Sequence, residues 1–331
     1  MIKVYIASLP NGFFGSAGQS WLTLNLEKIS NNLVSNEYKV IYTTIDQIPF
    51  LDLTSEDYLI YTSSDENHIR SYLKDIMYFA NKKCTIVPNY ESLLAHENKG
   101  FQQLFRAEKE FGNLSGGYHY DINALPLQRP LVFKLITGAG SSGVFLVKND
   151  SDFKKVKSGF FSNSLKRNAI KQYRKHKLSA SEYEIYKYRH TGFNNYVYQE
   201  FIEGLDCDYK ILVFGQKYYG LRRQVREGDF RASGSGGFSF VEIPQSILDF
   251  AESIFKTLDV PYASLDVALT KQNECHLIEY QALNFGPYTL VNSTGYYSRN
   301  DELWFFTEQK SDLEQSFSLA LFEFIQRKEC E

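Results

Sequence analysis

The 331-residue sequence has no run of about 18 apolar residues, so no segment of it is expected to cross a membrane as a helix. Its first seven residues lack the basic start, long apolar stretch and cleavage site of a signal peptide, and are typical of a buried strand. The four cysteines form no Cys-x-x-Cys pair, which argues against a disulfide framework. These absences predict a protein of the reducing cytoplasm.

An excess of basic charge is also missing. The chain has 36 Lys and Arg against 39 Asp and Glu, and a net charge of -3 does not favour a nucleic-acid binder. The six histidines form no metal-binding spacing, and neither a G-x-S-x-G elbow nor an H-E-x-x-H motif occurs. Serine hydrolases and zinc proteases of those types therefore lose support.

The residues that are present are those of an ordinary globular protein, 43% hydrophobic and 23% charged. The first ninety residues alternate between two kinds of pattern. Short apolar runs predict strands at 3–9, 39–45, 58–62 and 85–87, and helical spacing occurs at 21–34 and 69–80. This alternation predicts a parallel sheet with crossover helices. The loop at 10–18 lacks the G-x-G-x-x-G spacing, and is either a plain connection or a substrate contact.

The remainder of the chain changes character twice. A helix is predicted at 90–111, and a β-hairpin follows from strands at 130–135 and 144–147 around a glycine-rich turn. Strands then dominate at 196–202, 209–214, 217–223, 238–241, 264–269 and 274–280, with helices at 245–258 and 312–326. We therefore predict an α/β protein of three parts, at 1–90, 91–195 and 196–331.

A basic segment lies between the hairpin and the strand-rich part. Residues 153–189 carry eleven Lys and Arg against Glu182 and Glu184. A charge run of this kind is usually a solvated helix face. The competing hypothesis is a basic lid over an anionic substrate.

Two acids lie within apolar strands, Asp266 in Leu265-Asp266-Val267 and Glu279 in Leu277-Ile278-Glu279-Tyr280. A carboxylate among buried residues is costly unless it is paired or bound to a metal. On adjacent antiparallel strands the two acids would repel, and a divalent cation such as Mg²⁺ would remove that repulsion. The alternative is that both acids face solvent.

Two other segments are suited to phosphate. Lys134 precedes the glycine-rich run 138–143, whose backbone N–H groups could surround phosphate oxygens. The run does not end in the Gly-Lys-Ser/Thr of a Walker A motif, and most such hairpin loops bind nothing. Arg231 lies in the flexible stretch 228–237, and an arginine suits the charge on a transferring phosphoryl group. A surface hairpin is the alternative.

The order of these motifs resembles the ATP-grasp superfamily, in particular the branch of ribosomal-protein glutamate ligases and, more distantly, D-alanine–D-alanine ligases. The resemblance extends from about Tyr90 to Pro287. It implies a pre-ATP-grasp domain followed by two lobes that clasp ATP. The cofactors implied are ATP and Mg²⁺, for which Mn²⁺ can substitute.

The resemblance also assigns the ATP residues. Lys99 and Lys134 match the two ATP lysines, and Asp208 matches the position that meets the ribose, although Lys210 replaces the usual Arg. The backbone at the hinge, Glu200, Phe201 and Ile202, is expected to bind the adenine edge. The expected phosphate-loop residues are Gly138, Gly140, Ser141, Ser142 and Gly143.

The catalytic and metal positions follow in the same way. Gly-Asp-Phe-Arg-Ala at 228–232 makes Arg231 the contact to the transferring phosphate, with Ser233 where the family has Asn. Asp266 and Glu279 match the metal carboxylates. The third ligand is Asn in the family and Gln281 here, and Asn284 is the alternative.

The resemblance implies an ADP-forming carboxylate–amine ligase that acts through an acyl phosphate. Its substrates are a small-molecule or polymer carboxylate and amine. The acceptor is open between an amino acid, a peptide and a uronic-acid unit of a surface polysaccharide. A carboxylate kinase or nucleotide-binding regulatory protein is the alternative. No nucleic-acid partner and no membrane span are expected, and a homodimer remains open.

Overall fold

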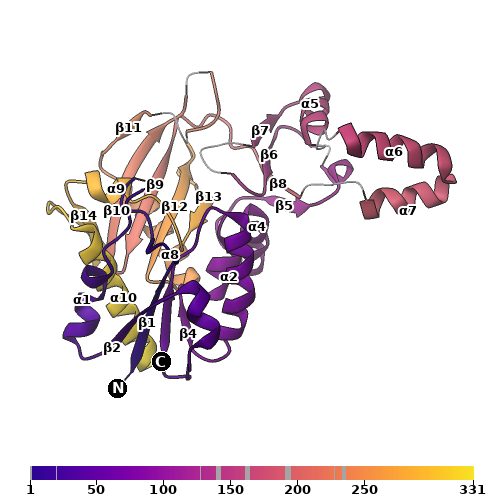
Figure 1. The fold of residues 1–331 in the computed structure, drawn as a ribbon. Coiled ribbons are helices and arrows are strands. Elements are labelled where there is room, and N and C mark those ends of the chain that lie inside the picture. The colour runs from indigo at the N-terminus through magenta and orange to yellow at the C-terminus, as the bar shows by residue number, and fades with distance from the viewer. Residues whose placement is uncertain are drawn as a thin grey trace. The chain divides into compact units, whose positions relative to one another are not determined.

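The structure is a computed structural model that describes residues 2–19, 21–126, 128–138, 143–160, 165–190, 195–226, 228–232 and 236–331. The chain divides into two compact units (Figure 1). One contains Met1–Leu114 with Ile202–Glu331, and the other contains Ser115–Phe201. The division into parts at 1–90, 91–195 and 196–331 stays a prediction.

The chain begins with a four-stranded parallel sheet, as its alternating pattern predicts. The strands are β1 (Lys3–Ser8), β2 (Lys39–Thr44), β3 (Tyr58–Tyr61) and β4 (Thr85–Val87), in the order β2-β1-β3-β4. The crossovers contain α1 (Leu26–Ser35), the 3-10 helix η1 (Ile45–Phe50) and α2 (Asn67–Ala80). The predicted parallel sheet is confirmed.

Helices cover both faces of this sheet because successive strand residues point to opposite sides. Tyr5, Leu59 and Tyr61 share a core with Leu73 and Met77 of α2. On the other face, the side chains of β1 and β3 share a core with α1 and with α10 (Leu313–Cys330). The sheet is therefore buried on both faces, as is usual for parallel sheets.

A seven-stranded antiparallel sheet forms the rest of the larger unit. Its main path is β13-β12-β9-β10-β14-β15, and β11 pairs with β10. The bounds are β9 (Cys207–Phe214), β10 (Lys217–Gln224), β11 (Phe238–Ser239), β12 (Tyr262–Leu269), β13 (Cys275–Gln281), β14 (Tyr296–Asn300) and β15 (Leu303–Thr307). Helix α8 (Gln245–Leu258) packs on one face, and the short α9 (Tyr288–Asn292) follows β13.

The prediction of one continuous helix at 90–111 is wrong, because two separate helices occupy this range. These are α3 (Tyr90–Ala95) and α4 (Lys99–Glu108). Between them Glu97 has a left-handed φ of 49°, and the Asn98 side chain accepts a hydrogen bond from the backbone N–H of Phe101. The turn and the N-cap stop one helix and start the next.

The smaller unit is built on a four-stranded sheet of order β5-β8-β6-β7. Its elements are β5 (Gly116–His119), η2 (Ile122–Ala124), β6 (Leu131–Leu135), β7 (Val144–Val147), α5 (Asp150–Phe160), α6 (Leu165–Lys177), α7 (Ala180–His190) and β8 (Tyr196–Glu200). The predicted β6–β7 hairpin is confirmed. Helices α6 and α7 lie side by side (Figure 1). In the described residues, no helix is long and apolar enough to cross a membrane.

Candidate functional site

One face of the seven-stranded sheet gathers charged residues from four adjacent strands. Asp266 of β12 is opposite Glu279 of β13 on one side and Lys210 of β9 on the other. Arg223 of β10 is opposite Asp208 of β9. Because paired residues point to the same face, all five side chains share it, while Tyr209, Leu265 and Val267 enter the core under α8. We call this surface the charged face.

The charged face is held together by a buried arginine. Arg223 Nε lies 2.6 Å from Asp208 Oδ1, and Arg223 Nη2 lies 2.8 Å from Asp208 Oδ2 and 2.8 Å from Asp266 Oδ2. Lys210 Nζ lies 3.3 Å from Asp266 Oδ1. Burial alone would raise the pKa of Asp266, but Arg223 and Lys210 hold it below its usual range. Burial raises the pKa of Asp208 against the opposing charge of Arg223.

A second set of polar contacts surrounds Glu279. Lys99 Nζ lies 3.6 Å from Glu279 Oε1, so the α4 lysine reaches the charged face. Gln281 Nε2 lies 3.4 Å from Glu279 Oε1 and 3.4 Å from Glu97 Oε1. Gln281 Oε1 lies 3.3 Å from Nδ1 of His96, a buried histidine whose pKa is lowered by its burial.

The donors on this face fit Mg²⁺ in part. Asp266 and Glu279 supply carboxylate oxygens, the kind of ligand that Mg²⁺ takes, and each carboxylate has more lone pairs than its present contacts use. The amide oxygen of Gln281 is directed to His96 instead. Asn284 lines a pocket described below. Within the described ranges, no three His, Cys, Asp or Glu side chains are grouped as a metal site.

The predicted phosphate and adenine residues lie mainly in the smaller unit. Lys134 is buried on β6. Gly143 directly precedes β7 and has a φ of 75°, and a Cβ there would meet Leu135 at 3.0 Å. Gly138 is described, whereas Gly140, Ser141 and Ser142 lie outside the described residues. The Glu200 side chain accepts a hydrogen bond from Ser115 N at 3.0 Å. Phe201 ends the smaller unit, and Ile202 belongs to the larger one.

Arg231 is held by a neighbour in its own loop. Its Nε and Nη2 lie 2.9 and 2.6 Å from Asp229 Oδ2, and its side chain is 31% exposed. This contact fixes the guanidinium near the surface of the loop. Ser233 lies outside the described residues.

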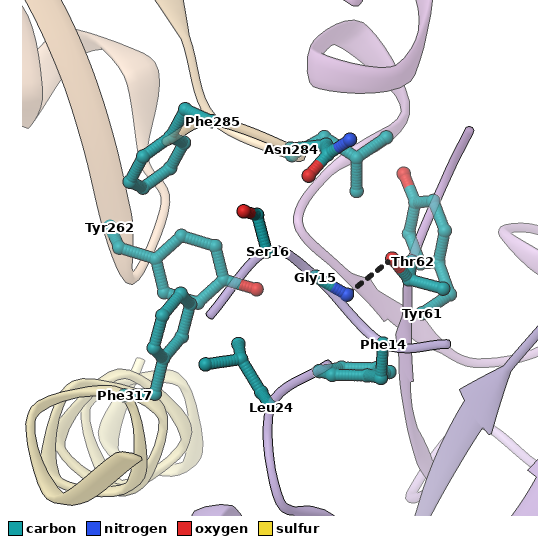
Figure 2. A pocket seen from close by; sticks show the side chains of 11 residues that line it. Phe14, Gly15, Ser16, Leu24, Tyr61, Thr62, Tyr262, Asn284, Phe285 and Phe317 are labelled. Carbon is teal, nitrogen blue, oxygen red and sulfur yellow. Dashed lines mark hydrogen bonds between the residues drawn. The ribbon is translucent and has the colours of Figure 1, made fainter. Parts of the chain in front are cut away.

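A small pocket opens beside the parallel sheet of the larger unit (Figure 2). The loop after β1 contributes Ser16, the end of β3 contributes Thr62, and the segment after β13 contributes Asn284. Gly15 N donates a hydrogen bond to Thr62 Oγ1 at 3.2 Å. The lining is uncharged and largely aromatic, with Phe14, Tyr61, Tyr262, Phe285 and Phe317.

The position of this pocket follows from the sheet topology. After β1 the chain goes to one side for β2 and to the other for β3, so the sheet order reverses between β1 and β3. In open α/β sheets, ligands bind outside the carboxyl ends of the strands at such a reversal. The loop at 10–18 therefore lies where that rule places a ligand.

Three parts of this arrangement were missed by the sequence analysis. Arg223, His96 and Glu97 were not assigned roles, although each makes a contact described above. The adjacent Arg222-Arg223 on a predicted strand was a usable signal, because one of two neighbours must face each side of a sheet. No local pattern marks His96, whose partner Gln281 is 185 residues away.

Comparison with known families agrees with this architecture. The RimK-like ATP-grasp domain matches residues 118–285, half of the chain. The chain therefore belongs to the RimK-like ATP-grasp family, which places it among the ATP-dependent ligases that form carbon–nitrogen bonds. No curated protein matches the sequence.

Solved structures share the fold over the whole chain. D-cycloserine synthetase DcsG has 8% identity and a TM-score of 0.56, covering 98% of this chain and 100% of its own. D-alanine–D-alanine ligase from Bacillus anthracis has 12% identity and a TM-score of 0.52, covering 100% of both chains. The ATP-grasp ligase PsnB, complexed with minimal precursor, Mg and ADP, has 10% identity and a TM-score of 0.54, covering 97% of both. At these identities the similarity is one of fold.

Proposed function

We propose that the protein uses ATP to convert a carboxylate into an acyl phosphate and transfers the acyl group to an amine. The observation that carries the proposal is the charged face, where Asp266 and Glu279 are paired across strands and contacted by Lys99, Lys210 and Arg223. Phosphoryl transfer needs acids for a divalent cation and cations for phosphate oxygens. This face supplies both.

The proposed reaction has two steps. A substrate carboxylate oxygen bonds to the γ-phosphorus of ATP while the bond to the β–γ bridging oxygen breaks, which releases ADP. The amine nitrogen then attacks the acyl carbon, phosphate leaves, and the nitrogen loses a proton. No protein nucleophile is required, so positioning and electrostatics account for catalysis.

The residues have the following proposed roles. Lys99 and Lys134 bind phosphate oxygens together with the backbone of 138–143, and Arg231 stabilises the transferring phosphoryl group. The backbone at Glu200–Ile202 binds adenine, and Asp208 meets the ribose with lone pairs that Arg223 leaves unused. Mg²⁺, or Mn²⁺ in its place, supplies positive charge at the phosphates when bound. Asp266 and Glu279 would hold it.

The substrates are proposed from two surfaces. The uncharged, aromatic pocket of Figure 2 suits a neutral part of one substrate. The basic segment 153–189 suits an anionic acceptor, and its described side chains Arg174, Lys175 and Lys177 are exposed. An amino acid, a peptide and a uronic-acid polymer remain the candidate acceptors. The four cysteines are free, which supports the proposed reducing cytoplasm.

Phosphate release tests the proposal. The purified protein is incubated with ATP, Mg²⁺ and panels of acids and amines, and products are identified by mass spectrometry. Phosphate release that requires both an acid and an amine, with a product equal in mass to the amide, is the expected result. The proposal is wrong if an acid and an amine that both bind in the presence of ATP never give an amide.

A carboxylate kinase is the second candidate. Ser233 and Gln281 stand where the family has Asn, and these departures affect the acceptor end of the site more than the ATP end. A kinase would release ADP at the same rate with and without amine, and hydroxylamine would trap its acyl phosphate as a hydroxamate. Amine-dependent ADP release excludes this candidate.

A further inference from the structure

The junction between α3 and α4 contacts the carboxyl end of β13. His96 is 3% exposed and Glu97 is half-buried, and both contact the side chain of Gln281. Gln281 in turn contacts Glu279, the predicted metal ligand two residues earlier on the same face of the strand. Contacts therefore run continuously from a buried histidine to a metal carboxylate.

The chemistry of the neighbours fixes the orientation of the Gln281 amide. Its Nε2 lies 3.4 Å from a carboxylate oxygen of Glu97 and 3.4 Å from one of Glu279, and both of these atoms only accept hydrogen bonds when ionised. Its Oε1 lies 3.3 Å from His96 Nδ1, which can donate. Rotating the Gln281 amide by 180° would exchange its nitrogen and oxygen, and the oxygen would then face two carboxylates that cannot donate a hydrogen bond to it. The oxygen that could bind a metal is therefore committed to His96.

The backbone supports the same arrangement. Glu97 has a φ of 49°, a left-handed conformation that is unfavourable for a non-glycine residue and persists where the surroundings enforce it. This turn places His96, Glu97 and the buried Lys99 near one another just before and within the first turn of α4. In the described part of the chain the His96 Nε2 has no hydrogen-bond partner, so Gln281 provides the bond that orients the ring.

We infer that Gln281 is a positioning residue, held by His96 and Glu97, which donates a hydrogen bond to the metal carboxylate Glu279 and does not bind the metal itself. This inference rests on the proposed function, because it assumes that Glu279 holds the cation. The metal then takes its protein ligands from Asp266 and Glu279. The affinity of the protein for the metal therefore depends on His96, which orients Gln281.

The test is Mn²⁺ binding followed by electron paramagnetic resonance in saturating ADP, which does not depend on turnover. The variants are His96→Leu, Gln281→Leu, the double variant, and His96→Asn, whose amide can still donate to Gln281. His68→Asn, at a side chain 79% exposed, is the matched control. ADP binding without metal and the thermal unfolding midpoint are measured for each variant.

The expected result has a definite pattern. His96→Leu and Gln281→Leu each raise the Mn²⁺ dissociation constant about tenfold, the lower end of the usual loss for a residue that orients a metal ligand. The double variant is no weaker than the single ones, because both act on the same contact. His96→Asn and the His68 control stay close to the wild type, and ADP affinity without metal is unchanged. If His96→Leu does not fold, Glu97→Ala removes another contact of the same amide and should also weaken Mn²⁺ binding.

Two results overturn the inference while the proposed function stands. If Gln281→Leu weakens Mn²⁺ binding and His96→Leu strengthens it or leaves it unchanged, the amide binds the metal directly. If neither variant changes Mn²⁺ binding, the contacts have no bearing on the metal. A wild-type protein that binds ADP but no Mn²⁺ overturns the metal site of the proposed function and this inference with it.

Discussion

The charged face and the basic segment 153–189 both concentrate charge, but in opposite surroundings. On the charged face Asp208 and Arg223 are each 6% exposed, and Arg223 donates two hydrogen bonds to Asp208 at 2.6 and 2.8 Å. On α6 the described basic side chains are exposed, and Arg174 and Lys177 lie over tyrosine rings at 5.9 and 5.8 Å. Each buried charge is expected to have a large effect of its own, because its removal leaves its partner buried without an opposite charge. Exposed charges act together and are screened by salt.

The largest effect is expected at the two carboxylates of the charged face. Asp266→Asn and Glu279→Gln should each abolish turnover, a loss of at least about a hundredfold given the usual weight of one electrostatic contact in an active site. Both changes keep the shape of the side chain. Phosphate release measures turnover, and circular dichroism checks the fold. Full activity in either folded variant would remove the metal assignment.

The next effect is on stability. Arg223→Met removes the cation that Asp208 and Asp266 share, and should lower the free energy of unfolding by about 3–5 kcal/mol. Denaturant unfolding measures the change. Arg327→Met is the matched control, because Arg327 pairs with Asp259 and Glu331 at exposed positions and its loss should cost about 0–1 kcal/mol. Equal losses in the two variants would show that the charged face is no more tightly coupled than the surface.

A smaller effect, on ATP binding, is expected for Lys134, the proposed phosphate-binding lysine of the smaller unit. Lys134→Ala should weaken ATP binding by about 1.5–3 kcal/mol, roughly tenfold to a hundredfold, because a charge-assisted contact is lost. Calorimetric titration with ATP measures it, and Lys148→Ala, at the residue directly after the hairpin strand β7, serves as control. If ATP affinity and turnover are both unchanged, the glycine-rich run is only a hairpin loop.

The smallest effect per residue is expected for the basic segment 153–189, and it concerns the binding of an anionic acceptor. Replacing Lys171, Arg174, Lys175 and Lys177 together by Gln should raise the KM of an anionic acceptor, leave that of ATP unchanged, and flatten the salt dependence. Exposed charges lose most of their reach above about 0.15 M salt, where the Debye length is about 8 Å.

Four exposed lysines of the larger unit, Lys28, Lys39, Lys83 and Lys271, give a control of equal charge when changed to Gln. An acceptor KM that responds neither to salt nor to the α6 substitutions would mean that the segment only coats a solvated helix face.

Much of the fold could be predicted because its signals are local. Short apolar runs predicted β1 to β4 nearly to the residue, and the antiparallel pairing of Asp266 with Glu279 follows from two neighbouring strands with a short turn. Helix α1 begins later than its pattern predicted, at Leu26 and not at Trp21. Asn25 caps it by accepting a hydrogen bond from Lys28 N, and Trp21 is 77% exposed.

The parts that could not be predicted depend on distant partners. The strands β14 and β15 were not predicted, and the pairing of β14 with β10 joins residues far apart in the sequence. The contact between His96 and Gln281 exists only because α4 packs across β13. Motif order could assign Lys99 to the ATP site, but its approach to Glu279 depends on the same packing.

Helix α10 has a consequence for the order in which this chain can fold during synthesis. Its residues complete the core on one face of the N-terminal sheet, and Phe317 also packs against Phe214 and Tyr262 of the large sheet, with ring centroids 4.9 and 4.7 Å apart. The apolar side chains of β1 and β3 on that face are fully covered only when residues 313–330 have been made, although those residues are distant in the sequence. A nascent chain therefore carries a sheet face that α1 covers only in part until that point. We expect chaperones that bind extended apolar strands to associate with it until α10 has been made.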